Sequence, residues 1–319
     1  MICQNQTWEK SFGASSEVLP RGIQVFERGW LSSNNILFDD GETSCLVDSG
    51  YSTHSAQTIE LLQVKLGSRP LDRLINTHLH SDHCGGNAAL QAKYPELVTS
   101  IPPGLARFVK NWDTAGLTYE ATGQQCPQFG YDALLSPGSR IRLGFSDWDV
   151  YAAPGHDPDA VLLFEPEQKI LISGDALWES GFGVVFPELD GDNAFDQVRS
   201  TLDLIEQLLP KIVVPGHGPL FRYKEETLVA ARGRLAAFVE DPVKHARHAV
   251  KVLLKFKLLE VQQQPIAQFY QWANGTPYLH TCRNRFFQEI DFSHFIQQMC
   301  EELVRSRVAR IDGGFIYNS

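Results

Sequence analysis

The chain has 319 residues, of which 43% are hydrophobic and 21% are charged, as in soluble globular proteins with one large core or a core and a smaller domain. Its formal net charge of -10 argues against a general binder of nucleic acid, because neutralising phosphates requires a surplus of Lys and Arg. No basic segment followed by an apolar run opens the sequence, and no stretch approaches the roughly 18 apolar residues of a membrane span. We therefore expect a cytoplasmic protein with a small-molecule partner, and the sequence leaves a homodimer open.

The first quarter of the chain predicts an antiparallel opening sheet. The runs IQVFERGW and NNILFDDGETSCLVD are rich in strand-forming residues, and the second contains the turn residues Asp39-Asp40-Gly41. Residues 53–66 follow with apolar side chains at helical spacing, and Gly67 can end that helix. Residues 71–77 then predict a short strand that runs directly into His78.

The pattern of strands and helices continues to residue 220. We predict helices over 86–94 and 194–209 and strands over 97–101, 148–152, 160–164, 169–173 and 212–214. The second helix has a stripe formed by Val198, Leu202, Ile205, Leu208 and Leu209, and Pro210 ends it. Residues 103–137 give no clear prediction. Strands mixed with helices and hairpins predict an α+β fold, in which sheets pack between helix layers.

Beyond Leu220 the sequence becomes mainly helical. We predict a first domain over 1–240 and a C-terminal unit over 241–319, with the boundary near Asp241-Pro242. The last residues predict a hairpin that turns at Asp312-Gly313-Gly314, so this mostly helical unit resembles a winged helix. A helical extension packed on the first domain fits the pattern equally well.

A histidine-rich motif, THLHSDHCGG, spans residues 77–86. Alternate residues His78 and His80 project from one side of an extended strand end, and Asp82 and His83 follow on the turn into a helix. Three further candidate ligands come later at predicted strand ends, in APGH, SGD and PGHG: His156, Asp175 and His217. Clustered imidazole and carboxylate groups suit zinc, iron(II) or manganese.

The order HLHSDH, PGH, SGD and GHG resembles the ligand pattern of the metallo-β-lactamase superfamily, over roughly residues 22–220. The resemblance implies an αββα sandwich with two divalent transition-metal ions, most readily zinc. It implies that His78, His80 and His156 hold the first ion, that Asp82, His83 and His217 hold the second, and that Asp175 bridges them. A carboxylate at the bridging position is similar to glyoxalase II and lactonases, which lowers the rank of antibiotic hydrolysis.

Two cations bridged by one carboxylate would acidify bound water and polarise the carbonyl group of a substrate. We therefore expect hydrolysis of a small ester, thioester or lactone by a metal-bound hydroxide. Asp82 is a ligand first and a proton carrier to the leaving group second. The loop 176–191 carries Trp178, Phe182 and Phe186 as candidates for an acyl pocket, although the same aromatics could pack the loop onto its domain.

Several alternatives stay open. They are a mononuclear-iron persulfide dioxygenase, a metal-dependent nuclease or phosphodiesterase, and a non-enzymatic sensor, for which the intact ligand set is unfavourable. The C-terminal part contains four basic residues, His245, Arg247, His248 and Lys251. We cannot match them residue by residue to the glutathione-binding residues of glyoxalase II, and we interpret them as a solvated helix face.

The six cysteines form no CxxC pair, which argues against a zinc-finger framework or a dithiol redox motif. They are Cys3, Cys45, Cys84, Cys126, Cys282 and Cys300. We predict reduced thiols throughout. Cys84 adjoins the histidine motif, and we interpret it as a small buried helix residue and not as a ligand.

Overall fold

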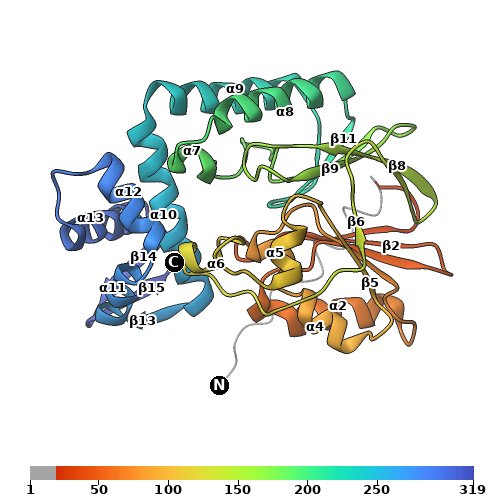
Figure 1. Cartoon of the computed structure of the whole chain (residues 1–319), viewed down its shortest axis with the longest axis horizontal. Helices are drawn as coiled ribbons and strands as arrows, with labels where there is room; N and C mark the ends of the chain where they lie inside the picture. The colour runs from red at the N-terminus through yellow and green to blue at the C-terminus, as the bar shows by residue number, and fades with distance from the viewer. Residues whose placement is uncertain (1–18) are drawn as a thin grey trace.

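The computed structural model describes residues 19–319, so Cys3 lies outside the described part of the chain. Two six-stranded sheets pack face to face between outer layers of helices (Figure 1). This arrangement confirms the predicted αββα sandwich.

The first sheet follows chain order from the opening hairpins to the middle of the sequence. Its strands are β1 (Ile23–Phe26), β2 (Asn35–Asp39), β3 (Ser44–Val47), β4 (Arg73–Ile75), β5 (Val98–Ile101) and β6 (Ala133–Leu134). The first pairs are antiparallel, as predicted, and the strands from β3 to β6 run parallel. Helices α2 (Ser55–Leu66) and α4 (Asn87–Lys93) cover its outer face (Figure 1). The first ends at Gly67, whose φ of 64° suits glycine.

The second sheet has the order β12-β11-β10-β9-β8-β7. Its strands are β7 (Arg140–Leu143), β8 (Ser146–Ala152), β9 (Val161–Glu165), β10 (Ile170–Gly174), β11 (Ile212–Pro215) and β12 (Phe221–Arg222). Helices α8 (Ala194–Leu208) and α9 (Glu225–Glu240) cover its outer face (Figure 1). The predicted stripe of α8 is buried at Val198, Leu202 and Ile205. The prediction is wrong for Leu209, because this residue caps the helix in a left-handed conformation and is 56% exposed.

Strands β9, β10 and β11 of the second sheet are buried on both faces, and successive side chains along a strand point alternately into two different cores. In β9, Val161 and Leu163 join the core between the two sheets. Leu162 and Phe164 point the other way and join the core under α8 and α9. A run of consecutive apolar residues is therefore needed to fill two cores from one strand.

The segment 103–137, which gave no clear sequence prediction, folds into three short elements, and the last of them is the edge strand of the first sheet. They are α5 (Ala106–Asn111), α6 (Tyr119–Thr122) and β6. Two other short helices, α3 (Ser81–Cys84) and α7 (Phe186–Asp190), occur in the histidine motif and in the loop after β10. Elements of this length carry too few residues for a periodic pattern.

The C-terminal region contains α10 (Pro242–Val261), β13 (Gln263–Pro265), α11 (Ile266–Asn274), α12 (Pro277–Phe286), α13 (Phe292–Arg305), β14 (Ala309–Asp312) and β15 (Phe315–Asn318). The predicted hairpin is confirmed, since β14 pairs antiparallel with β15, which also pairs with β13. The winged-helix description and the boundary at residue 241 stay predictions.

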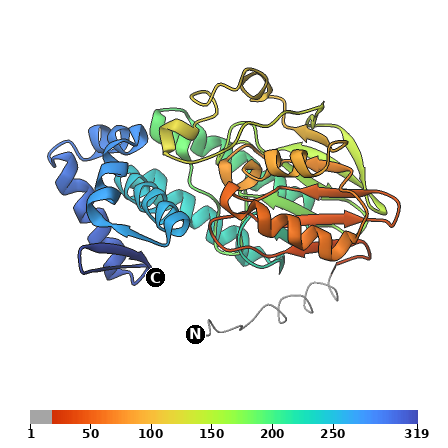
Figure 2. The same ribbon diagram turned by 90° about the horizontal axis from the view of Figure 1, so that it is seen from below.

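The C-terminal helices lie beside one end of the sandwich (Figure 2) and α10 joins the two. The ring of Phe256 lies 5.1 Å from that of Tyr51, and the Tyr51 hydroxyl donates to Glu260 Oε2 at 3.3 Å. These contacts hold α10 against the loop that follows β3 of the sandwich. Across residues 19–319, no helix combines the length and apolar character needed to cross a membrane.

Leu163→Ala tests the core between the sheets. Leu163 is fully buried, so we expect the free energy of unfolding to fall by about 2 to 5 kcal/mol through lost burial and a cavity. The matched control is Val229→Ala on α9, where a 64% exposed side chain should change stability by less than about 0.5 kcal/mol. Urea denaturation measures both, and equal losses would contradict the assignment of this core.

Candidate metal centre

The seven predicted ligand side chains follow strand ends at one edge of the sandwich. Strands β10 and β11 are parallel, so their carboxyl ends place Asp175 and His217 side by side. His156 follows β8, and the histidine motif follows β4 of the other sheet. The Val161 amide donates to the Thr77 carbonyl at 2.8 Å, which joins the two sheets at this edge.

Three imidazoles form the first group of side chains. The ligand atoms of His78, His80 and His156 lie within 4.8 Å of one another. His80 Nδ1 is 3.1 Å from His78 Nε2 and 2.8 Å from His156 Nε2. Nitrogen atoms from all three rings therefore converge on one point.

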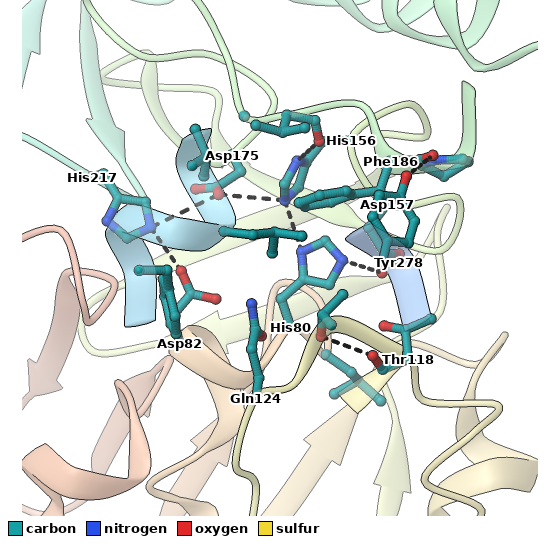
Figure 3. A pocket seen from close by; sticks show the side chains of 18 of the residues that line it. His80, Asp82, Thr118, Gln124, His156, Asp157, Asp175, Phe186, His217 and Tyr278 are labelled. Atoms are coloured by element: carbon teal, nitrogen blue, oxygen red, sulfur yellow. Dashed lines mark hydrogen bonds and ion pairs between the residues drawn. The ribbon is translucent and has the colours of Figure 1, made fainter. Parts of the chain in front are cut away.

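The second group contains Asp82, His83, Asp175 and His217, whose ligand atoms also lie within 4.8 Å of one another. Asp82 Oδ2 is 3.0 Å from His217 Nε2. The Asp175 carboxylate lies between the groups, as Figure 3 shows for His156 and His217. Its Oδ1 is 3.4 Å from His83 Nε2, and its Oδ2 is 3.4 Å from His156 Nε2 and 3.8 Å from His217 Nε2.

The donor atoms fit divalent metal ions better than a purely hydrogen-bonded cluster. His83 Nε2 is buried and has no hydrogen-bond partner of acceptable geometry. The three converging nitrogens of the first group cannot all be satisfied by shared hydrogens, because each neutral imidazole has one N–H and one lone pair. A cation at each group would remove both problems. The His/Asp clusters thus point to a divalent metal pair.

Hydrogen bonds on the far side of the rings orient the imidazoles. The other nitrogen of His83, Nδ1, lies 2.8 Å from the carboxylate of Asp48, and that of His156 donates to the Val184 carbonyl at 2.5 Å. Asp48 also accepts from the Thr77 amide and hydroxyl, both at 2.8 Å. Such partners fix the tautomer so that Nε2 presents its lone pair to the centre. The sequence analysis missed Asp48, which ends a strand in a left-handed conformation with φ of 58°.

The charges of the two groups differ. Burial, with the imidazoles of His83 and His80, holds the pKa of His78 well below its ordinary value, and burial with His80 lowers the pKa of His156 to about 4. Burial opposes ionisation of Asp175, but His217 and His83 hold its pKa well below the ordinary range. At neutral pH His78 and His156 are therefore neutral imidazoles and Asp175 is a carboxylate, the forms that bind metals. In the second group burial opposes protonation of His83, but the carboxylates of Asp48 and Asp175 raise the pKa of this imidazole well above its ordinary value.

A cavity of about 690 Å³ opens over both groups. Of the aromatic residues predicted to form an acyl pocket, Trp178 and Phe186 line it. Phe186 lies 6.2 Å from the His80 ring, and the Trp178 indole donates to Asp175 Oδ1 at 3.2 Å. Phe182 is instead buried in the core under α8 and α9, so its role in the loop is packing.

Several cavity residues escaped the sequence analysis because they come from distant segments. Trp30 stacks on His217 with ring centroids 5.5 Å apart. Gln124 also lines the cavity, and its side-chain oxygen accepts from the Ser81 hydroxyl at 2.5 Å. Helix α12 contributes Tyr278, whose hydroxyl donates to the Phe186 carbonyl at 2.8 Å (Figure 3). No local motif marks any of these residues.

The predicted solvated basic face of α10 is only partly correct. Arg247 and Lys251 share a face, but both pair with Glu302 of α13. His245 is fully buried, and His248 lines the cavity. Arg247 and Lys251 are therefore half-buried against α13, while His245 lies in the interior and His248 is half-buried at the cavity wall.

Cys84 is fully buried on α3, as predicted. Its sulfur lies 3.1 Å from the Tyr119 hydroxyl and 3.8 Å from Cys126 Sγ. The five cysteines within residues 19–319 are all free thiols.

Comparisons with known proteins agree with this geometry. Residues 28–217 match the family described as Metallo-beta-lactamase superfamily. Hydroxyacylglutathione hydrolase GloC of Haemophilus influenzae is 27% identical over 195 residues, which cover 58% of this chain and 84% of the relative. Acyl-coenzyme A thioesterase MBLAC2 of Gallus gallus is 29% identical over 170 residues, which cover 49% and 59%.

Solved structures show the same fold. A di-iron-bound structure is 28% identical with a TM-score of 0.51, and covers 65% of this chain and 96% of its own. A metallo-beta-lactamase family protein from Thermus thermophilus is 17% identical with a TM-score of 0.55, and covers 94% of this chain and 99% of its own. The second likeness extends over the C-terminal helices as well as the sandwich.

Gly216→Ala tests whether the close approach at the second group matters. A Cβ atom at Gly216 would lie 2.2 Å from Asp175 Oδ1 and 2.9 Å from His83 Cε1, so the carboxylate must move. We expect the purified variant to lose at least one metal ion per chain by elemental analysis. Gly233→Ala on α9 is the control, because nothing lies within 4 Å of its added Cβ. Unchanged metal content in Gly216→Ala would refute the importance of this contact.

Proposed function

Because the chain belongs to the metallo-beta-lactamase superfamily, we propose that it is a hydrolase that uses two divalent metal ions to cleave a small thioester, ester or lactone. The observation that carries the proposal is the position of Asp175. Its two oxygens face imidazoles of both ligand groups, below a cavity with apolar walls. A carboxylate in this position can hold two cations close together.

The names of two relatives support thioesters as our first choice among these substrates. The names hydroxyacylglutathione hydrolase and acyl-coenzyme A thioesterase both describe cleavage of a thioester. Trp178 and Phe186, which line the cavity beside the ligands, would contact the acyl group.

We assign the ligands as two sets that share one residue. His78, His80 and His156 would hold the first ion and Asp82, His83 and His217 the second, with Asp175 between them. When bound, such ions acidify coordinated water and polarise a carbonyl oxygen. Zinc is our first choice, because it binds imidazole and carboxylate and needs no redox partner, while iron and manganese accept the same ligands.

The chain itself supplies proton transfer and orientation. Asp82 lines the cavity, and its Oδ2 contacts His217 while the rest of its carboxylate faces the cavity (Figure 3). In this proposal Asp82 would pass a proton to the leaving thiolate or alkoxide. The hydrogen bonds that His83 and His156 donate to the Asp48 carboxylate and the Val184 carbonyl would keep both rings in the orientation that this chemistry needs.

The alternatives have less support. A single-iron dioxygenase would leave the second group without a purpose, yet all four of its side chains are buried or half-buried and converge. The net charge of -10 disfavours a nuclease, because phosphate binding requires a cationic face. An intact pair of ligand groups also disfavours a sensor without catalysis.

Asp175→Ala tests the proposal. We expect the protein to stay folded but to lose occupancy of the second ion and about 100-fold or more in turnover of thioesters, esters or lactones. The reason is that loss of mere supporting hydrogen bonds costs about 10- to 100-fold in metal affinity or activity, and Asp175 lies closer to the centre. Elemental analysis, circular dichroism and turnover are measured on one preparation.

The control for this variant is Asp147→Ala, which removes an exposed carboxylate that pairs with Arg142 on the surface. It should keep metal content and turnover. Unchanged metal content and unchanged turnover in Asp175→Ala would contradict both the bridging role and the hydrolytic mechanism. Elemental analysis of the unaltered protein also identifies the metal, and a single iron per chain would favour the dioxygenase.

A further inference from the structure

A second polar feature lines the cavity on the side of the helical layer. Arg234 of α9 and His248 of α10 both contribute to the cavity wall that also contains Asp82, His156 and Asp175. Within residues 19–319, Arg234 is the one Lys or Arg side chain in that wall. A substrate in the cavity can therefore contact both the candidate metal-binding side chains and a single positive charge.

Arg234 is held in place without being neutralised. Its guanidinium carbon lies 5.5 Å from the centre of the Phe182 ring and 5.3 Å from that of Phe238. Its Nη2 donates to His248 Nε2 at 2.8 Å. Stacking on aromatic rings and a bond to a neutral imidazole orient the group but leave its charge unbalanced.

No carboxylate offsets this charge in the described part of the chain. Glu179, Asp190 and Asp192 line the same cavity, but no ion pair joins Arg234 to any acid of residues 19–319, and its buried Nε lacks a hydrogen-bond partner. Arg232, two residues earlier on α9, instead pairs with Asp203 and Glu206. Burial lowers the pKa of Arg234, in keeping with a cation that has lost water and gained no acid.

His248 adds a second donor to this site. Because a guanidinium has no acceptor, His248 Nε2 must accept from Arg234, and the ring hydrogen is on Nδ1. Burial, with Arg234 and Lys251 nearby, lowers the pKa of His248 to about 4. The ring is therefore neutral at physiological pH, and it can donate without adding a charge.

The loop after β10 fixes the position of Arg234 relative to the metal ligands. The Trp178 amide donates to the Gly181 carbonyl at 2.7 Å, which closes a tight turn. At one end of this turn the Trp178 indole donates to Asp175. At the other end Gly181, with φ of 126°, packs so tightly that an added Cβ would lie 2.9 Å from Arg234 Cδ. The Arg234 side chain and the Asp175 carboxylate thus both contact the same turn.

We propose that Arg234, with His248, binds an anionic group, a carboxylate or a phosphate, at the end of the substrate remote from the scissile bond. An unpaired and partly buried arginine is unfavourable by itself, and a bidentate anion would offset that cost. Apolar residues that line the same cavity, such as Val184 and Leu253, would contact the connecting part of the substrate. This inference rests on the proposed hydrolysis of an acyl substrate and narrows its class to anionic ones.

The test compares Arg234→Gln with the unaltered protein on three matched thioesters, ending in a carboxylate, a phosphate or a neutral amide. We expect the unaltered protein to prefer one anionic ester by about 10-fold or more in kcat/KM, since a hydrogen bond between charged groups is stronger than one to a neutral amide. Arg234→Gln should lose that preference through KM and keep its rate on the amide. Whichever anionic ester is preferred identifies carboxylate or phosphate as the group.

Arg232→Gln is the matched control, because it removes a surface arginine of the same helix, and it should keep the preference. Binding of uncleavable thioether analogues, measured by calorimetry, separates this inference from the proposed function. Tighter binding of an anionic analogue that is lost in Arg234→Gln supports the anion site even if no thioester is cleaved. Equal binding of anionic and neutral analogues by the unaltered protein, or an equal loss for all substrates in Arg234→Gln, overturns it. The comparison on the unaltered protein decides the matter if the variant does not fold.

Discussion

The Asp175 carboxylate is the constraint on which the rest of the site depends. It is buried and ionised, and it lies within 3.4 Å to 3.8 Å of imidazole nitrogens from His83, His156 and His217. Burying a charge is costly unless opposite charges or donors surround it, so the fold must bring those rings together from separate strands. The parallel pair β10 and β11 and the cross-sheet bond from Val161 to Thr77 achieve this. The same arrangement suits a pair of cations.

The cavity joins this centre to parts of the chain that contribute no ligands. Phe186 lies against the His80 ring on one side and is tied through its carbonyl to Tyr278 of α12 on the other. Helix α10 itself contacts the sandwich through Tyr51. Substrate selection is therefore expected to reside in the helical region and the loop after β10, while the chemistry resides at the sheet edge.

The seven side chains that the sequence proposes as ligands do converge in two groups, because each lies in a short motif at a strand end, where local spacing is informative. The sequence predicted the cavity less well. Trp30 and Arg234 reach the cavity from segments far from the ligand motifs, and only the tertiary fold brings them together. Phe182 is an aromatic residue of the kind that lines pockets, but its side chain packs in the core under α8 and α9. The sequence of an irregular loop does not show which side chains face inward, so this prediction failed. The elements of residues 103–137 were not predicted because each is too short to show a periodic pattern of apolar residues.

Anomalous X-ray diffraction from crystals of the metal-loaded protein tests the central claim most directly. Our account predicts two metal peaks roughly 3.5 to 4 Å apart. One peak should be bound by His78, His80 and His156, the other by the remaining group, and Asp175 should contact both. A single peak, or two peaks of which only one contacts Asp175, would contradict the account.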